Sequence, residues 1–400
     1  MSKGNASAGK NLPPNPYDFI WNATEPERKL FSPHDRFTDH TGFLECHLEA
    51  ETAIFIPQSG SSERTSAAAP ATFIRNAAGV PIVPGSSLKG LLRSLMETLG
   101  PGCWSLYNAD GPYVEKLPSK PGKEPRIINT PFNLPARFRH CSSIDKLCPA
   151  CRMFGMIEPK EQGALRTNAR DVDANAAAQR ALLGKVGVDD AECQPETEDA
   201  EDAMHTVVLA PPKPHHTAWY WHTHGDKRPA GRKYYLHHPV AGNAAPSDST
   251  LDKYIVPVGA GSTFSFRVYV TNITDEELAL LVYALVLEED MRHKIGMAKP
   301  YGFGSAHLTI IGVRLWSMEA RYRKRLTRQL DEDAIVDVAD FVRERRQQAL
   351  RRIDADTLGQ LRRIWRWPVV GMPPAYPDRD KWFRISGNSG KKLDTLNPRA

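Results

Sequence analysis

The chain has 400 residues, of which 41 % are hydrophobic, and its formal net charge is +5 at pH 7. This length is enough for one large domain with insertions or for two smaller domains. No stretch approaches the roughly 20 apolar residues of a membrane-spanning helix, and the N-terminus has no apolar core like that of a signal peptide. We therefore expect a cytoplasmic protein without membrane contact, and its modest basic excess permits an acidic partner without requiring one.

The beginning of the chain predicts an arm, a strand and a helix. Residues 1–16 are small, polar and proline-bearing, which is typical of a flexible arm. Alternation over 42–57 predicts a strand, and glycine and proline in 74–85 predict a turn or a short hairpin. The helix that follows has Ser86 or Ser87 as its N-cap and ends at Gly100. Its apolar face carries Leu88, Leu91, Leu92, Leu95, Met96 and Leu99.

The start of this helix is a candidate phosphate site. Gly85 opens a turn, and the first amide groups of a helix lack partners and attract anions. The hydroxyl groups of Ser86 and Ser87 could assist, and Lys89 and Arg93 project together because they are four residues apart. An ordinary capped helix start is the alternative interpretation.

Three of the six cysteines crowd into a short segment as Cys141, Cys148 and Cys151. A CxxC pair with a third thiol nearby is typical of a structural zinc site. Three thiolates need a fourth ligand, and we favour Cys103, since the alternative His140 is adjacent to Cys141. Free buried thiols are the competing interpretation.

The middle of the chain, 157–260, is interpreted as an insertion without a core of its own. It holds an acidic stretch over 189–202 and a part rich in histidine and aromatic residues. Lys213, Arg232 and Lys233 lie among tryptophans and tyrosines, a mixture that fits base stacking with phosphate contact. These residues could instead pack inside the insertion, and histidines between 215 and 238 could belong to a zinc enzyme.

Regular structure is predicted again after 261. A strand over 263–270 leads to a helix over 274–289 with Thr274 as its N-cap, and a strand over 306–316 follows a glycine-punctuated loop. This loop and its entry supply further candidate RNA contacts, although a simple hairpin is the commoner outcome: Lys294, Lys299, Tyr301, Gly302 and Gly304. Residues 317–366 look helical and rich in arginine. The order of elements predicts an α+β, ferredoxin-like core with insertions.

Several segments together resemble the RAMP (repeat-associated mysterious protein) superfamily. The start IVPGSSLKGLLRSLMETL is similar to the signature helix of that family, and CPACRMFG looks like its cysteine segment in type III CRISPR backbone subunits. IGMAKPYGFGSAHLTI resembles the glycine-rich loop and strand near the C-terminus of the family. ARDVDA, PPKP and GRKYYLHH are similar to the divergent members of type III-D and III-E systems.

The resemblance implies one modified RNA-recognition-motif domain over 17–316, with a zinc insertion at about 103–156 and a thumb-like insertion at about 157–260. Residues 317–400 would form a helical extension and tail. Such a subunit would bind guide RNA (crRNA) and the complementary target RNA beside other CRISPR subunits, reading duplex shape while base pairing reads sequence.

The chain differs from RNA-cleaving relatives in the loop that carries their catalytic residue. Their aspartate lies in a loop that reads SSERTSAAAPAT here, and alanine cannot supply an ionisable group. We therefore expect binding without cleavage. An endoribonuclease is the alternative, with Glu63, His47 and His40 as weak candidates for cutting target RNA or for processing precursor guide RNA.

Overall fold

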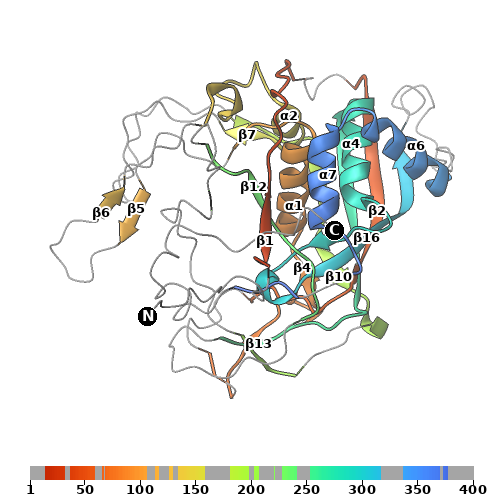
Figure 1. Cartoon of the computed structure of the whole chain (residues 1–400). Helices are drawn as coiled ribbons and strands as arrows, with labels where there is room; N and C mark the ends of the chain where they lie inside the picture. Colours follow the sequence, from red (N-terminus) through yellow and green to blue (C-terminus); the bar gives the residue numbers. More distant parts are fainter. Residues whose placement is uncertain are drawn as a thin grey trace, which may run out of the picture.

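The computed structural model describes fourteen stretches of the chain. They are residues 14–31, 37–58, 65–66, 68–105, 113–116, 126–128, 134–157, 181–197, 202–206, 220, 228–240, 253–316, 337–369 and 373–376. Figure 1 shows helices α1, α4 and α7 side by side in front of one central sheet.

The central sheet is antiparallel, and its strands run in the order β15-β16-β2-β14-β10-β4, with β9 also paired to β14. These strands are β2 (His40–Ala50), β4 (Ile82–Val83), β9 (Val186–Val188), β10 (Ala191–Cys193), β14 (Thr263–Ile273), β15 (His293–Lys294) and β16 (Ser305–Leu315). Leu44, Cys46 and Leu48 alternate with more exposed residues along β2, so one face of the sheet forms the core.

This connectivity is that of a ferredoxin-like core. β2 leads to helix α1 (Gly85–Leu99), β9 and β10 form the second strand position, and β14 is followed by helix α4 (Asp275–Val286) and β16. In space the four positions run fourth, first, third, second, which is the βαββαβ arrangement. The prediction of an α+β, ferredoxin-like core is confirmed.

Helix α1 covers the core face with the predicted leucine stripe. Leu88, Leu92, Leu95, Met96 and Leu99 are each 1 % exposed or less, whereas Leu91 is half-buried. Each such burial stabilises the fold by roughly 1.5–3 kcal/mol. The helix ends at Gly100 as predicted, but it begins at Gly85 with Pro84 as N-cap, so the prediction of a serine N-cap is wrong.

Helix α4 is the most deeply buried helix of the described residues, as its nearly continuous apolar sequence predicts. Thr274 is its N-cap, and its hydroxyl accepts from the Glu277 amide at 3.2 Å while the Glu277 carboxylate accepts from the Thr274 amide, a capping box. Leu278, Leu281 and Tyr283 have no exposed surface.

Smaller sheets surround the core. β1 (Tyr17–Ile20) pairs with β12 (Arg232–Tyr235), and β13 (Lys253–Val256) lies between β11 (Met204–Thr206) and β3 (Ala71–Thr72). β5 (Tyr113–Lys116) pairs with β6 (Arg126–Ile128), and β7 (Met156–Ile157) with β8 (Ala181–Leu182). The short helices are η1 (Ala136–Phe138), α2 (Pro149–Phe154), η2 (Pro195–Thr197) and η3 (Lys299–Tyr301).

One boundary prediction needs correction. Within the insertion expected over 157–260, residues 186–193 belong to the core sheet, where Val186 and Cys193 are buried. The acidic sequence hides this strand, because Asp189, Asp190 and Glu192 are exposed whereas Ala191 and Cys193 are buried.

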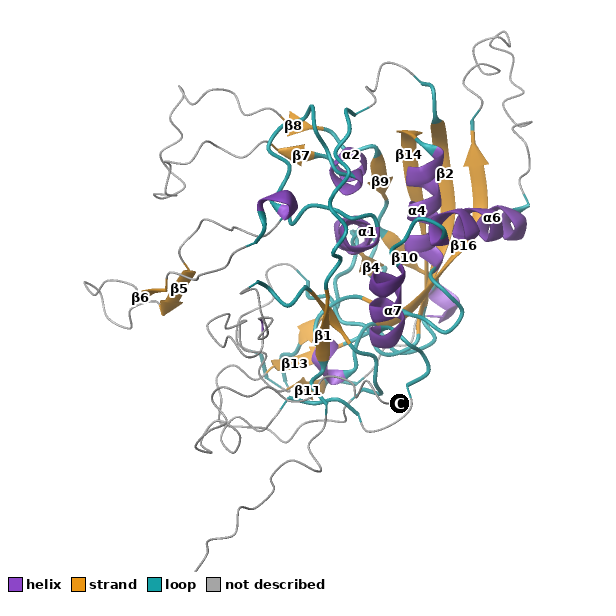
Figure 2. Cartoon of the chain, turned by 45° about the horizontal axis from the view of Figure 1, so that its top comes forward, coloured by secondary structure: helices purple, strands orange, loops and turns teal. Residues whose placement is uncertain are grey.

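The C-terminal helices α6 (Val338–Leu350) and α7 (Ala355–Ile364) pack on α4 and β1 respectively (Figure 2). Their arginines pair mainly with nearby carboxylates: Arg345 with Asp275, Arg352 with Glu276, Arg362 with Glu288 and Arg363 with Asp18. These arginines therefore serve contacts within the chain.

Candidate metal centre and nucleic-acid interface

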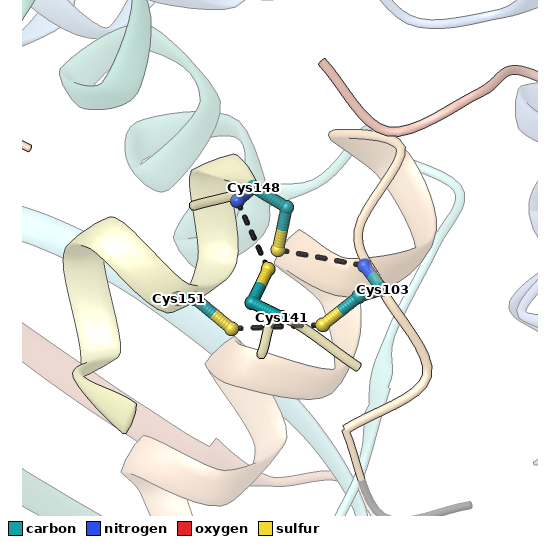
Figure 3. A group of neighbouring side chains, drawn as sticks. All are labelled: Cys103, Cys141, Cys148 and Cys151. Carbon is teal, nitrogen blue, oxygen red and sulfur yellow. Dashed lines mark hydrogen bonds between the residues drawn. The ribbon is translucent and has the colours of Figure 1, made fainter. Parts of the chain in front are cut away.

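The four predicted metal ligands come together in the folded chain. The sulfur atoms of Cys103, Cys141, Cys148 and Cys151 all lie within 4.8 Å of one another, and all four residues are buried. Figure 3 shows them converging from the end of α1, from a loop and from α2. The Cys103 and Cys151 sulfurs are 3.6 Å apart, and none of the four residues forms a disulfide.

This cluster fits a tetrahedral metal ion. Zn–S bonds of about 2.3 Å place neighbouring sulfurs about 3.8 Å apart in a tetrahedron. Backbone amides already point at two sulfurs: the Cys103 amide donates to Cys148 Sγ at 3.4 Å, and the Cys148 amide donates to Cys141 Sγ at 3.3 Å. The four buried cysteines could therefore bind a metal ion, and a thiolate set favours zinc over a hard cation.

The thiols do not titrate as independent groups. The hydrogen bond from Cys103 is the largest cause that lowers the pKa of Cys148 to about 7 and holds the pKa of Cys141 well below its ordinary value. Side-chain hydrogen bonds within the cluster raise the pKa of Cys103 and of Cys151. Metal binding would require the thiolate form of all four.

Two arginines lie against the cysteine cluster. Arg93 from α1 has an Nη atom 3.8 Å from Cys151 Sγ, donates to the Gly155 carbonyl at 3.1 Å and pairs with Glu97 at 3.1 Å. Arg232 donates to the carbonyl oxygens of Gly102 and Cys103 at 3.1 and 2.8 Å. Both were predicted as RNA contacts, whereas in the structure their guanidinium groups contact the cysteine cluster.

A buried ion pair joins the cysteine-bearing helix α2 to the core. Arg152 of α2 pairs with Glu277 of α4 at 2.7 Å, and the two side chains are 12 % and 4 % exposed. Its second nitrogen donates to the Leu147 carbonyl at 2.9 Å. Glu277 also closes the capping box of α4, so one carboxylate connects the cysteine-bearing helix to a core helix.

The start of α1 differs from the open phosphate site that the sequence predicts. The Gly85 amide donates to the Asp190 carboxylate at 2.7 Å. A Cβ at Gly85 would lie 2.2 Å from the Val188 carbonyl, so glycine is required for packing against the β9–β10 connection. Gly85 is buried, and the helix N-terminus already holds an anion of its own chain. No sequence pattern pointed to Asp190.

The next residues of α1 remain accessible. Ser86 is exposed, while Ser87 and Lys89 are half-buried. Burial, and then the charge of Arg93, lower the pKa of Lys89. Lys89 has no carboxylate partner among the residues described in the structure. This polar end of α1 is therefore a surface that an anion could reach.

The glycines of the predicted RNA loop pack against the protein itself. A Cβ at Gly302 would lie 2.4 Å from the Pro239 carbonyl, and one at Gly304 would lie 1.8 Å from the Ile295 carbonyl. Both residues are buried with φ values of +93° and +79°. Their role in the structure is close backbone packing, so direct ligand contact at these two glycines is not supported by their position.

A buried hydrogen-bond network holds this loop. Lys294 is 3 % exposed, and its Nζ donates to the Gly302 carbonyl and to Ser305 Oγ, each at 3.0 Å. The imidazole of His237 bonds Ser305 Oγ and the Arg292 carbonyl, each at 2.9 Å. Burial is the main cause that lowers the pKa of Lys294 and of His237 well below ordinary values. Lys294 therefore supports the loop from inside, which corrects its expected surface role.

The remaining loop candidates lie nearer the surface. Lys299 and Tyr301 are half-buried, and Lys299 Nζ donates to the Gly296 carbonyl at 2.5 Å. Lys233 is also half-buried, and its ammonium lies 3.8 Å from the Tyr17 ring centroid and 4.6 Å from that of Tyr235. Burial lowers the pKa of Lys233 to about 8. Lys213 lies outside the described residues.

The two catalytic candidates that the structure describes, His40 and His47, do not lie together. Glu63 lies outside the described residues. His40 and His47 are seven positions apart on β2, which corresponds to roughly 23 Å along a strand. His40 Nε2 is 2.5 Å from the Asp275 carboxylate at the start of α4, whereas His47 lies on the sheet face opposite the buried Leu48.

The histidines at 237 and 238 are unsuited to a second metal site. His237 and His238 are each 2 % exposed. The ring nitrogens of His238 lie 2.9 and 3.0 Å from the carbonyl oxygens of Pro239 and Pro300. Both nitrogens of each ring face protein groups, so neither residue supports the zinc-enzyme alternative.

Comparison with known proteins places the chain in a family. No curated protein matches it. Among solved structures, the crystal structure of Thermofilum pendens Csc2 is similar at 16 % identity and a TM-score of 0.32, covering 84 % of this chain and 85 % of that one.

Among the described residues, every helix is too short or too polar to cross a membrane. The family described as the RAMP superfamily matches residues 47–307, which is more than half of the chain and includes α1, the cysteine cluster and the glycine loop. The chain therefore belongs to the RAMP superfamily.

Proposed function

We propose that this protein is a guide-RNA-binding subunit of a type III CRISPR effector complex. The observation that carries the proposal is the polar start of α1, where Ser86, Ser87 and Lys89 are accessible on the signature helix of a RAMP core. Hydroxyl and ammonium groups at that position suit a phosphate backbone, which the protein can hold without reading sequence.

A second contact region is the loop around Lys299 and Tyr301. This loop follows β15, whereas α1 follows β4. Strands β15 and β4 lie at opposite edges of the central sheet. A ligand that contacts both must extend across the end of the sheet, as an RNA strand could. Arg93 and Arg232 would then act mainly by shaping the cysteine cluster, and Asp190 would limit anion access to the Gly85 amide itself.

Zinc is the metal we propose for the four cysteines, with a structural role. Four protein thiolates complete a tetrahedron and leave no open coordination position for chemistry. The ion would tie residues 141–151 to the segment that follows the C-terminal end of α1. The described parts of 157–260 outside β9 and β10 would belong to a thumb-like insertion, as in the type III-D and III-E subunits that the sequence resembles.

We propose binding without cleavage by this chain. General acid–base cleavage needs ionisable groups placed together, and His40 is engaged with Asp275 far from His47 along β2. Other CRISPR subunits, guide RNA and target RNA are the proposed partners.

The first test is purification of the chain with its genomic neighbours, followed by sequencing of the bound RNA and a cleavage assay on complementary RNA. Recovery of short guides with a repeat-derived end, and no cutting that depends on His40, His47 or Glu63, would support the proposal. An intact, zinc-loaded protein that recovers no RNA would refute it.

The second test measures the salt dependence of RNA affinity for Lys89→Gln. Loss of one phosphate contact should reduce the slope of log affinity against log salt by about 0.7 for single-stranded RNA. Lys146→Gln is the matched control, since Lys146 is exposed but lies in the cysteine-bearing segment. Equal slopes for the two variants would argue against the α1 surface.

A further inference from the structure

One face of the central sheet is covered by helices, and the opposite face is open. Helices α1 and α4 lie on the same side of the sheet, and α6 packs on α4 (Figure 1). Along β2, β14 and β16, the side chains that alternate with the buried core residues keep contact with solvent on the other side. An antiparallel sheet with one accessible face can use that face to bind a ligand.

One end of the open face carries a row of aromatic side chains. The register of the strands places Tyr269 of β14 and Arg314 of β16 on either side of Phe43 on β2. The ring centroids of Tyr269 and Phe43 are 5.9 Å apart, and Tyr269 is 36 % exposed. The Trp316 ring continues the row, 6.3 Å from Phe43. We call Phe43, Tyr269, Arg267 and Arg314 the open-face patch.

Two arginines lie over the central ring of the open-face patch. The guanidinium carbons of Arg267 and Arg314 are 4.9 and 6.0 Å from the Phe43 ring centroid. Arg267 is held by Glu45, to which its Nη and Nε atoms donate at 2.8 and 3.2 Å. Arg314 is exposed and has no carboxylate partner among the residues that the structure describes. The patch therefore has one positive charge that its own carboxylate does not balance.

Exposed aromatic rings beside an unbalanced cation suit the nucleotides of a single strand. Every base has a planar face that can stack on an aromatic side chain, and the cation can meet the adjoining phosphate. Neighbouring strands lie about 4.8 Å apart, so Tyr269 and Phe43 are close enough to contact nucleotides that follow one another. The bases of a duplex already stack on each other, so a duplex cannot use these rings in the same way.

Strand β9 connects the open-face patch with the start of α1. Gly187 of β9 pairs with Tyr269, and a Cβ at Gly187 would lie 3.6 Å from Tyr269 Cβ, so glycine leaves this side of the tyrosine uncovered. The carbonyl of the next residue, Val188, packs against Gly85 of α1. Among the described strands β9 pairs only with β14, so it forms part of the sheet edge. An RNA strand at the start of α1 could cross this edge and reach Tyr269.

We propose that the open-face patch binds an unpaired stretch of the guide RNA, with bases stacked on Tyr269 and Phe43 and a phosphate beside Arg314. The inference rests on the proposed function and adds a second RNA surface to it. A nucleotide supplies both a planar face for the rings and a negative charge for the arginine. An apolar protein surface would cover the rings but leave Arg314 without a matching charge.

The first experiment locates the RNA by cross-linking. The full zinc-loaded chain, purified with its guide RNA, is irradiated with ultraviolet light, and the peptides bonded to RNA are identified by mass spectrometry. We expect cross-links between guide nucleotides and Tyr269 or Phe43 before any target RNA is added. Cross-links at these residues that form only after complementary target RNA is added, or none at either residue, would overturn the inference.

The second experiment measures affinity by anisotropy, with a fluorescein-labelled octa-uridylate and a labelled RNA duplex. Tyr269→Leu should weaken single-strand binding about tenfold, because it removes one stacking surface, and should leave duplex binding unchanged. Tyr269→Phe should bind as the wild type does. Tyr376→Leu is the matched control, since Tyr376 has a similar exposure of 37 % and packs on Tyr17.

The arginine gives an independent readout that does not depend on the folding of Tyr269→Leu. Arg314→Gln should reduce the slope of log affinity against log salt by about 0.7 for single-stranded RNA, as expected for one lost phosphate contact. Arg343→Gln is the control, because Arg343 pairs with Asp340 on α6. Equal slopes for the two variants would contradict a phosphate at Arg314.

The outcomes separate this inference from the proposed function. If the Tyr269 and Arg314 variants bind RNA as the wild type does while Lys89→Gln is weakened, the open-face inference is wrong and the proposed function stands. If the chain binds no RNA, both are wrong. If RNA affinity is unchanged but the Tyr269→Leu chain loses co-purifying subunits, the open-face patch binds protein and the inference is overturned.

Discussion

The cysteine-bearing lobe, residues 103–105 and 134–157, and the glycine loop, residues 295–304, both bury polar groups beside the same core. In the lobe, four sulfurs converge with arginines around them, and a cation could bind at their centre. Beside the glycine loop, Lys294 of β15 donates to the Gly302 carbonyl and to Ser305 Oγ, which also bonds His237. Burying a charge is costly unless it is paired or neutralised. The four sulfurs of the lobe could be neutralised by a metal ion, whereas burial lowers the pKa of Lys294 and of His237 beside the loop.

The largest expected effect comes from the lobe. Cys148→Ser should abolish stoichiometric zinc binding and lower the free energy of unfolding by on the order of 4 kcal/mol or more, because structural metal sites couple ligand loss to unfolding. Metal content by mass spectrometry and urea unfolding would measure both. Cys193→Ser is the matched control, since that buried cysteine lies outside the cluster and should keep the metal. Equal zinc content in the two variants would show that Cys148 is not a zinc ligand.

Near the glycine loop, the free energy of unfolding should depend on pH. His293, on the strand that enters the loop, is 1 % exposed and donates to the Ala284 carbonyl at 2.8 Å. Burial lowers its pKa to about 4. The unfolded chain binds a proton below its pKa of about 6.5 while the folded chain does not, so stability is lost as pH falls from about 6.5 toward 4.

For such a histidine the loss between pH 7 and pH 5 is about 2 kcal/mol. His293→Gln keeps a donor for Ala284 but cannot titrate, so it should remove that part of the pH dependence of urea unfolding. His47→Gln is the control, because His47 lies on the face of β2 opposite the buried Leu48, whereas His40 is paired with Asp275. A His293→Gln variant with the pH dependence of the wild type would contradict the assignment.

A smaller effect tests the arginine that contacts the cluster. Arg93→Gln should weaken zinc affinity about tenfold, because hydrogen bonds from outside the ligand set commonly contribute that much to metal affinity. Competition with a chromogenic chelator would measure the affinity. Arg343→Gln is the control, since Arg343 pairs with Asp340 on α6. Unchanged zinc affinity in Arg93→Gln would show that Arg93 does not support the metal site, and Arg93 would again be a candidate RNA contact.

The smallest effect is expected at the C-terminal helices. Their arginines form ion pairs at the surface, unlike the buried polar groups of the lobe and of the glycine loop. Arg345→Gln should reduce the free energy of unfolding by about 0.2–1 kcal/mol, and the difference should shrink in high salt. Urea unfolding at two sodium chloride concentrations would show it. Arg366→Gln is the comparison, since Arg366 has no carboxylate partner among the described residues. A large, salt-independent loss in Arg345→Gln would indicate packing rather than charge.

The sequence by itself determined the periodic elements and the cysteine cluster. The leucine stripe of α1, the N-cap at Thr274 and the CxxC with two further cysteines each depend on residues close in the chain or on a chemistry that few other patterns share. Their local geometry leaves little choice, so pattern alone was sufficient.

Only the tertiary structure decided which polar residues are free to meet a ligand. The Gly85 amide is taken by Asp190, Lys294 is taken by Gly302 and Ser305, and Arg93 is taken by Glu97 and the cysteines. Asp190 is 105 residues from Gly85 and Cys151 is 58 residues from Arg93, whereas Glu97 lies on the same helix as Arg93. A sequence lists donors and charges, but long-range packing determines which of them are already satisfied.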